Sequence, residues 1–400
     1  MIGNIPNTIN LSRFDAIGIH YSLHLSDPDY HYLSESSINL LSRFLGLKCI
    51  WMHDEYRRVN AVVQILKRIG IDVIFSLASG STLETLYPKK FLPDTRLETV
   101  LAGYVSNNLR TKMTIPINSR PIDISYRTRR PPFWLGYLGQ EKINIGESFV
   151  NNSLSKSLNL DISVEEYDRV YGDEWLNLLI NSKAVLCVES GSSVIDFSGN
   201  IELEVEKACE ENKKITFREI KNRYLLDIDG KYLINPISPR VFEAAAMGTV
   251  MIGFIGHYSG IMKSWVHYIP LEKDFSNINT VIDSIKDIKL LEKIAANAKR
   301  DLVEVDDYSY EAFSAFCGRT LLEELHNRTY IQLTTNPYIP MTFMKDLLFS
   351  PKYIFHNYIT YFFQIFLLRS ALRFYMCHIW LRLPLWLRQL IKPILKILGR

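Results

Sequence analysis

The feature that most constrains the fold is an alternation of short apolar runs with segments of helical period. Apolar runs at 14–20, 47–52 and 71–78 alternate with segments at 34–45 and 57–69, in which apolar residues recur every three or four positions. Strands and helices that alternate in this way form parallel sheets covered by helices on both faces. The sequence therefore predicts an α/β fold, with functional groups in the loops that follow the carboxyl ends of the strands.

A second block of the same kind begins after a polar stretch at 107–121, which is expected to link two domains. Its clearest helix is predicted at 238–247, where Ser238 can cap the first turn, Pro239 fits the first helical position and Gly248 can end the helix. Two such blocks predict two Rossmann-like domains that face a cleft. The expected parts are an N-terminal domain at 1–115, a C-terminal Rossmann-like domain at 119–305, a closing helix at 306–330 and a cationic aromatic tail at 331–400.

The charge of the chain is unevenly distributed. The 400 residues carry a formal net charge of +3, but eight basic residues and no acidic ones follow Asp346, so residues 1–346 carry −5. A mildly acidic body argues against a module that binds nucleic acid through a broad basic face. The five cysteines form no CxxC pair, and the N-terminus lacks the pattern of a signal peptide, so a cytoplasmic protein is expected.

The segment 126–130 (YRTRR) places three guanidinium groups directly after a predicted strand. Arg127 and Arg129 could hold a phosphate there through charge-assisted hydrogen bonds, although a solvated linker would show the same pattern. The helix that starts at Ser238 offers free backbone N–H groups to an anion, with Arg240 and Glu243 on neighbouring positions of one face. On sequence alone, a capped helix with an internal ion pair explains these residues equally well.

Three further loops hold candidate groups. Glu189, Ser190 and Gly191 open a small polar loop (ESGSS) that could contact a ligand through its backbone or be an ordinary turn. His20, His53 and Asp54 follow strands of the first block, where a general base could face the cleft, although a histidine in a loop is more often simply solvated. Asp227 and Asp229 have the spacing of a metal-binding pair but precede Gly230, which favours a turn. The sequence contains no Walker loop, no GxGxxG after a strand and no GxSxG.

The segment SPRVFEAAAMG at 238–248, followed by an apolar run, resembles the nucleotide-sugar site of group 1 glycosyltransferases with the GT-B fold. Similar proteins share the motifs HYS, DEYRR, PIDISYRTR, ESGSS and YSG at 20–22, 54–58, 121–129, 189–193 and 258–260. The resemblance spans about residues 10–325. It implies transfer of a sugar from a nucleotide-sugar donor, without a bound metal or other cofactor, to an acceptor in the cleft.

Carried onto matching positions, the resemblance implies a role for each motif. Glu243 would hold the donor's ribose, Arg240 with Arg127 and Arg129 would neutralise the diphosphate, and Tyr258, Ser259 and Gly260 would line the donor pocket. Two departures stand out. Many members have a second glutamate where this chain has Asn235, for which Glu189 or Asp196 could substitute, and the first domain is short, as expected for a reduced enzyme or a truncated start.

The tail has the composition of helices that lie at a membrane surface. Residues 353–368 carry no formal charge, but as a helix they would span about 24 Å, less than the roughly 30 Å of the hydrocarbon core. Beyond them, arginines alternate with aromatic and leucine residues. We predict that the tail binds an anionic membrane on the cytoplasmic face; packing onto the body or a second subunit is the alternative.

Together these features predict a glycosyltransferase that acts on a glycan or lipid-linked acceptor in the synthesis of cell-surface polysaccharide or glycolipid. The alternative is a non-catalytic relative that binds a nucleotide sugar or serves as a membrane-bound scaffold. An intact base on the acceptor side would distinguish the two, and His20, His53 and Asp54 are its candidates.

Overall fold

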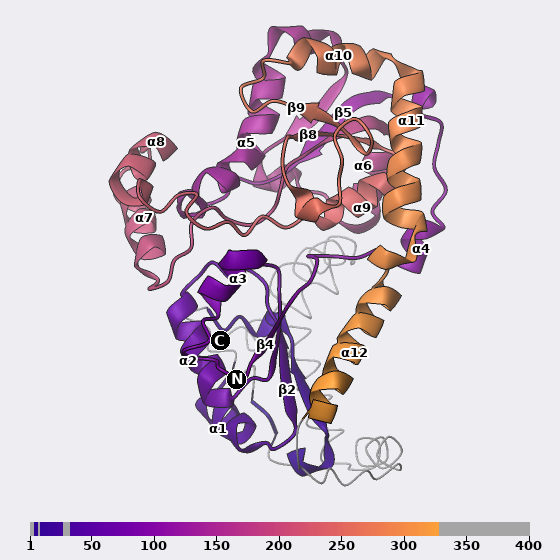
Figure 1. Ribbon diagram of the computed structural model, residues 1–400. Helices are drawn as coiled ribbons and strands as arrows, with labels where there is room; N and C mark the ends of the chain where they lie inside the picture. Colours follow the sequence, from indigo (N-terminus) through magenta and orange to yellow (C-terminus); the bar gives the residue numbers. More distant parts are fainter. Residues whose placement is uncertain (1–3, 7–8, 27–32, 328–400) are drawn as a thin grey trace, which may run out of the picture. The chain divides into compact units, whose positions relative to one another are not determined.

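The computed structural model describes residues 4–6, 9–26 and 33–327, which contain two parallel sheets (Figure 1). The α/β fold predicted from the sequence is thereby confirmed. The predicted tail at 331–400 lies outside the described residues, as does its expected binding to a membrane. Within the described part of the chain, no helix is long and apolar enough to cross a bilayer.

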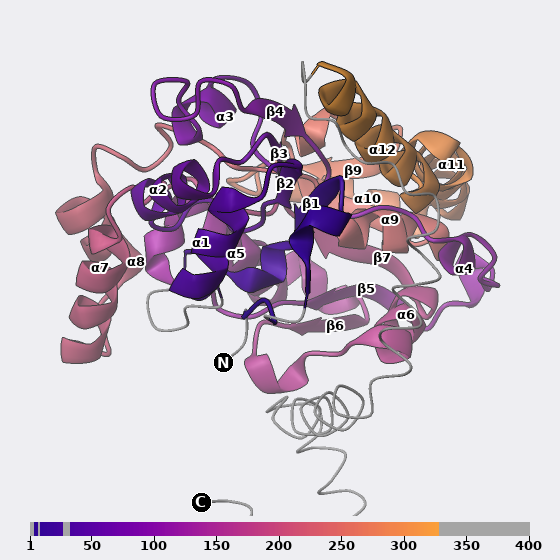
Figure 2. The same cartoon turned by 90° about the horizontal axis from the view of Figure 1, so that it is seen from below.

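The first sheet has four parallel strands in the order β1-β2-β3-β4. Its strands are β1 (Ala16–Ile19), β2 (Leu47–Trp51), β3 (Val73–Ser76) and β4 (Arg96–Thr99). Its helices are α1 (Glu35–Arg43), α2 (Val59–Ile69) and α3 (Gly80–Leu86). Helices α1 and α2 pack on one face, while α12 (Tyr310–Asn327) packs on the other and appears on the far side of the sheet in Figure 2. Strand β4 could not be predicted from hydrophobic patterning, because its residues are mostly polar and only partly buried.

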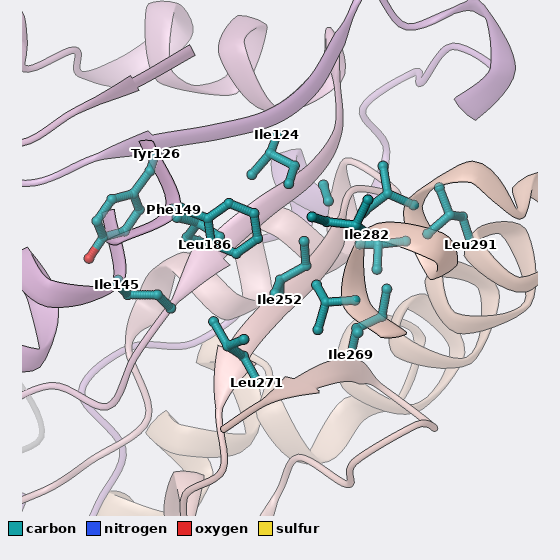
Figure 3. Close-up of a cluster of buried hydrophobic side chains, with 14 of the residues drawn as sticks. Ile124, Tyr126, Ile145, Phe149, Leu186, Ile252, Ile269, Leu271, Ile282 and Leu291 are labelled. Atoms are coloured by element: carbon teal, nitrogen blue, oxygen red, sulfur yellow. The ribbon is translucent and has the colours of Figure 1, made fainter. Parts of the chain in front are cut away.

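The second sheet has five parallel strands in the order β6-β5-β7-β8-β9. Its strands are β5 (Ile122–Arg127), β6 (Leu160–Ser163), β7 (Ser182–Cys187), β8 (Val250–Phe254) and β9 (Tyr268–Leu271). Helices α5 (Gly136–Asn151), α10 (Ile278–Lys286) and α11 (Ile288–Lys299) cover one face. Helices α6 (Gly172–Ile180) and α9 (Pro239–Ala246) cover the other. Alternate residues of β7, β8 and β9 enter the cores on the two faces, and Figure 3 shows the core on the face covered by α5, α10 and α11.

Three helices connect these elements: α4 (Asn107–Arg110), α7 (Asn200–Glu211) and α8 (Phe217–Ile220). Thr216 and Glu219 form the capping box predicted from their spacing at the start of α8. Helix α7 could not be predicted from a capping residue, because its N-cap is Gly199, which has no side chain to accept a hydrogen bond from the first turn. Its first turn is instead held by Asp196, whose carboxylate accepts hydrogen bonds from the backbone N–H groups of Gly199 (2.7 Å) and Glu202 (2.9 Å).

Candidate functional site

A cavity of about 290 Å³ at the carboxyl ends of β5 and β7 is strongly cationic. Four basic side chains line it: Arg129, Lys142, Arg169 and Arg240. Among the described residues, Asp54 is the single acidic one in the lining, and it comes from the loop after β2. A cavity with this excess of positive charge is suited to an anion with several negative charges.

Lys142 and Arg240 are held in this cavity at an electrostatic cost. Burial lowers the pKa of the Lys142 ammonium; Asp54 works against this, while the charges of Arg240 and Arg129 lower the pKa further. Burial also lowers the pKa of Arg240. Partly desolvated cations that repel one another are stabilised when an anion binds between them. Lys142, which lies on the largely buried helix α5, was not singled out from the sequence, since its position at the cavity depends on which face of α5 is covered.

The three arginines of the YRTRR segment have different surroundings. Arg127 forms an ion pair with Asp161 (2.5 Å) and donates to two backbone carbonyl groups, so its guanidinium is used within the sheet edge. Arg130 is exposed and forms ion pairs with Glu147 and Glu165. Arg129 lines the cavity and forms no ion pair with any residue that the structure describes. Of the two arginines predicted to hold phosphate, the structure thus brings only Arg129 to the cavity.

The start of α9 also lies at the cavity. The Ser238 hydroxyl oxygen caps the helix by accepting from the Arg240 N–H (3.4 Å) and lines the cavity. The Arg240 guanidinium lies 4.7 Å from the ring centre of Trp175, which also lines the cavity, and donates to the Arg127 carbonyl oxygen. The indole N–H of Trp175 donates to Glu243 (2.7 Å), which itself lines neither this cavity nor the others described below. In this structure Glu243 therefore holds Trp175 in place.

Glu189 joins the loop after β7 to two other segments. One of its carboxylate oxygens accepts from the Asn235 side-chain amide (3.0 Å) and from the backbone N–H groups of His257 (3.1 Å) and Tyr258 (2.7 Å). A glutamate at position 235 would place a second carboxylate against Glu189, whereas the asparagine amide donates to it. The neighbouring Ser190 lines the cationic cavity, so Glu189 positions the loop that forms one of its walls.

Gly191 of this loop has a backbone conformation that requires glycine. Its φ is +92°, and a Cβ atom there would lie 1.9 Å from the carbonyl oxygen of Ile234. We expect Gly191→Ala to lower the free energy of unfolding by about 1–3 kcal/mol more than Gly172→Ala, a control with positive φ but no atom near its Cβ position. Urea unfolding measures both losses. Equal losses would mean that the segment around Ile234 moves aside at no cost.

The segment from Tyr258 to Gly260 is hydrogen-bonded to the residues that precede α9. Tyr258 is fully buried and donates its hydroxyl to the Phe254 carbonyl oxygen (2.7 Å), so it is not exposed to a ligand. The Ser259 hydroxyl oxygen accepts from the Ile237 N–H (3.0 Å), one residue before Ser238. Ser259 lines a second cavity, described below, and Gly260 permits the left-handed turn with a φ of +73°.

The candidate base residues of the first sheet lie together. His20 and His53 line one small cavity, and Asp54 lines both that cavity and the cationic one. Nδ1 of His53 is 3.1 Å from Asp54, and this hydrogen bond is the main reason that the pKa of His53 is raised. Burial alone would raise the pKa of Asp54, but His53, the Tyr56 hydroxyl (2.7 Å) and the charge of Lys142 hold it below its usual value. Nδ1 of His20 is instead bonded to Ser22 (2.9 Å).

Two other acidic residues considered from the sequence, Asp229 and Asp196, form hydrogen bonds that support the fold. Asp229 accepts from the Tyr137 N–H (3.1 Å) and the Ser193 hydroxyl (2.7 Å), which fixes the start of α5. Asp196 holds α7, as described above. Among the residues that the structure describes, no group of three or more His, Cys, Asp or Glu side chains is arranged to hold a metal ion.

No protein-family model and no curated protein sequence matches this chain. Similar solved structures include an alpha-glucosyltransferase in complex with UDP-glucose and DNA containing an abasic site, with 12% identity over 79% of this chain and 81% of that chain and a TM-score of 0.46. HepE of Anabaena in complex with UDP has 9% identity over 78% and 79%, with a TM-score of 0.43. Sucrose-phosphate synthase from Thermosynechococcus elongatus has 12% identity over 79% and 75%, with a TM-score of 0.39.

These neighbours are glycosyltransferases with the GT-B fold, the group that the sequence motifs resemble. Their identity to this chain is too low for the role of any residue to be transferred from them.

Proposed function

We propose that this protein transfers a glycosyl group from a nucleoside diphosphate sugar to an acceptor. The observation that carries the proposal is the cationic cavity, in which Arg129, Lys142 and Arg240 converge beside the His53–Asp54 pair. Breaking the glycosidic bond of such a donor leaves negative charge on a diphosphate. Cations that are already in place stabilise that charge as it develops, which lowers the barrier to the reaction.

In the proposed reaction, Arg129, Lys142 and Arg240 bind the diphosphate, and Ser238 and the first turn of α9 face it. These side chains supply the positive charge that other enzymes obtain from a divalent cation, so the reaction is proposed to need no metal ion and no further cofactor. His53 accepts a proton from the acceptor hydroxyl through Nε2, because its Nδ1 is bonded to Asp54.

The proposed acceptor is a glycan or a lipid-linked sugar on the cytoplasmic face of a membrane, where it would enter surface polysaccharide or glycolipid synthesis. One neighbour was solved with DNA, but the charge of −5 over residues 1–346 argues against nucleic acid as the acceptor of this chain. Transfer of the sugar to duplex DNA by the protein would contradict this view.

The proposal is tested with purified protein and a panel of nucleoside diphosphates and their sugars. We expect one nucleotide to raise the melting temperature, because it binds only the folded state, and its sugar derivative to be consumed when acceptor is present. Binding without any sugar release or transfer would support the alternative of a non-catalytic nucleotide-sugar-binding protein. No shift with any nucleotide, from protein shown to be folded, would overturn the proposed function.

Membrane binding by the tail is a separate prediction. Each basic residue near an anionic surface contributes about 1 kcal/mol, so the eight that follow Asp346 should hold the full chain on anionic vesicles and release it at high salt. Replacing Arg369, Arg373, Arg382 and Arg388 with Gln is expected to abolish most of the binding in a sedimentation assay. Equal binding to zwitterionic vesicles, or no effect of the four substitutions, would contradict an electrostatic role.

A further inference from the structure

A second cavity, of about 550 Å³, differs in character from the cationic one and shares no lining residue with it. It is formed by the loops after β3 and β4, the segments around Asn235 and Ser259, and α12. Its walls are largely apolar and aromatic, with Leu77, Leu101, Tyr104, Tyr308, Phe313 and Phe316 among them. Its volume falls within the range of about 300–1,000 Å³ that is usual for small-molecule sites.

The aromatic wall of this cavity is already assembled. The rings of Tyr104 and Phe313 are stacked with their centres 4.5 Å apart, and the Tyr104 hydroxyl oxygen accepts from the Leu101 N–H (3.0 Å). Phe316 packs edge-on against the buried Phe75 of β3. Because these side chains are fixed by one another, an apolar ligand would enter the cavity without ordering them first.

Single hydrogen bonds connect this cavity to both parts of the proposed active site. The Leu77 N–H donates to Glu55 (2.7 Å), which lines the cavity of the candidate base His53. On the opposite wall, Ser259 accepts from Ile237, next to Ser238 of the cationic cavity. Leu77 directly follows β3, His53 lies two residues after the neighbouring strand β2, and neighbouring strands are about 5 Å apart. One elongated ligand could therefore lie in this cavity and reach His53.

We propose that this cavity holds the apolar part of a lipid-linked acceptor, with the acceptor's sugar hydroxyl presented to His53. This inference rests on the proposed function. The charged lining residues Asp307 and Arg319 have opposite signs, so the cavity favours an apolar body over an ion. Helix α12 contributes Phe313 and Phe316 to the wall, and the sequence after it continues into the cationic aromatic tail. The site is thus built on the helix that leads to the predicted membrane-binding segment.

The test compares n-octyl β-D-glucoside, kept below its critical micelle concentration, with free glucose on the full chain. Saturation-transfer NMR is expected to show contact with the octyl chain, and octyl glucoside should bind at least tenfold tighter than glucose. Ala312→Phe, which fills the cavity from α12, should weaken octyl glucoside binding at least tenfold. The matched control is Ala315→Phe, an exposed residue of the same helix outside the lining, and it should leave binding unchanged.

Ser79→Trp narrows the cavity from its other wall at an exposed position and serves if Ala312→Phe does not fold. Octyl glucoside that binds no better than glucose, or binds both phenylalanine variants equally, would overturn the inference. The nucleotide panel is titrated into the same samples. Octyl binding that depends on Ala312 without any nucleotide binding would refute the glycosyltransferase and still locate an apolar site, so the two failures are distinguishable.

Discussion

Arg129→Gln is expected to weaken the binding of the nucleoside diphosphate about 10- to 100-fold, whereas Arg130→Gln should leave it unchanged. A hydrogen bond to a charged group contributes about 1.5–3 kcal/mol, which corresponds to this range of affinity. The two arginines are adjacent in the sequence, but only Arg129 lines the cationic cavity, while Arg130 pairs with Glu147 and Glu165 at the surface. Titration calorimetry of both variants measures the difference.

Lys142→Met should also weaken nucleotide binding, but it should not destabilise the empty protein. Because burial and two neighbouring arginines disfavour the charge of Lys142, its removal should leave the melting temperature of the empty protein unchanged or higher. The same substitution should abolish most of the rise in melting temperature on nucleotide binding. A loss of stability with normal nucleotide affinity would mean that Lys142 is a structural residue and that the diphosphate lies elsewhere.

His53→Gln is expected to lower kcat by about 10²- to 10⁴-fold, the range usual for loss of a general base, with little change in nucleotide affinity. His53 must be neutral to accept a proton, so the rate of the native protein should rise as pH increases through its raised pKa. Asp54→Asn removes the main cause of that raised pKa and should move this rise to lower pH.

His20→Gln distinguishes the two candidate histidines. His20 lines the same small cavity, but its Nδ1 is bonded to Ser22, and no carboxylate among the residues that the structure describes orients it. We expect the His20 variant to retain most of the activity. A large loss with His20→Gln and a small one with His53→Gln would reverse the assignment. Stopped assays over a range of pH, with nucleotide binding measured in parallel, provide the comparison.

The sequence predicts the helices and strands around this site better than it predicts which side chains line the cavity. The cap formed by Ser238 was predicted because its signals lie within a few residues of one another. The positions of Arg127 and Lys142 could not be predicted in the same way. Arg127 is taken up by Asp161 on the neighbouring strand, 34 residues away, and Lys142 reaches the cavity only because of how α5 packs. Such outcomes depend on contacts between segments distant in the sequence, which local patterns do not encode.

We propose that the cationic cavity holds the diphosphate of a nucleotide-sugar donor. A crystal structure of the protein with the nucleoside diphosphate that stabilises it most is the direct test. We predict phosphate oxygens within about 3 Å of the Lys142 ammonium and the Arg129 guanidinium. A nucleotide bound elsewhere, with this cavity free of phosphate, would contradict the account.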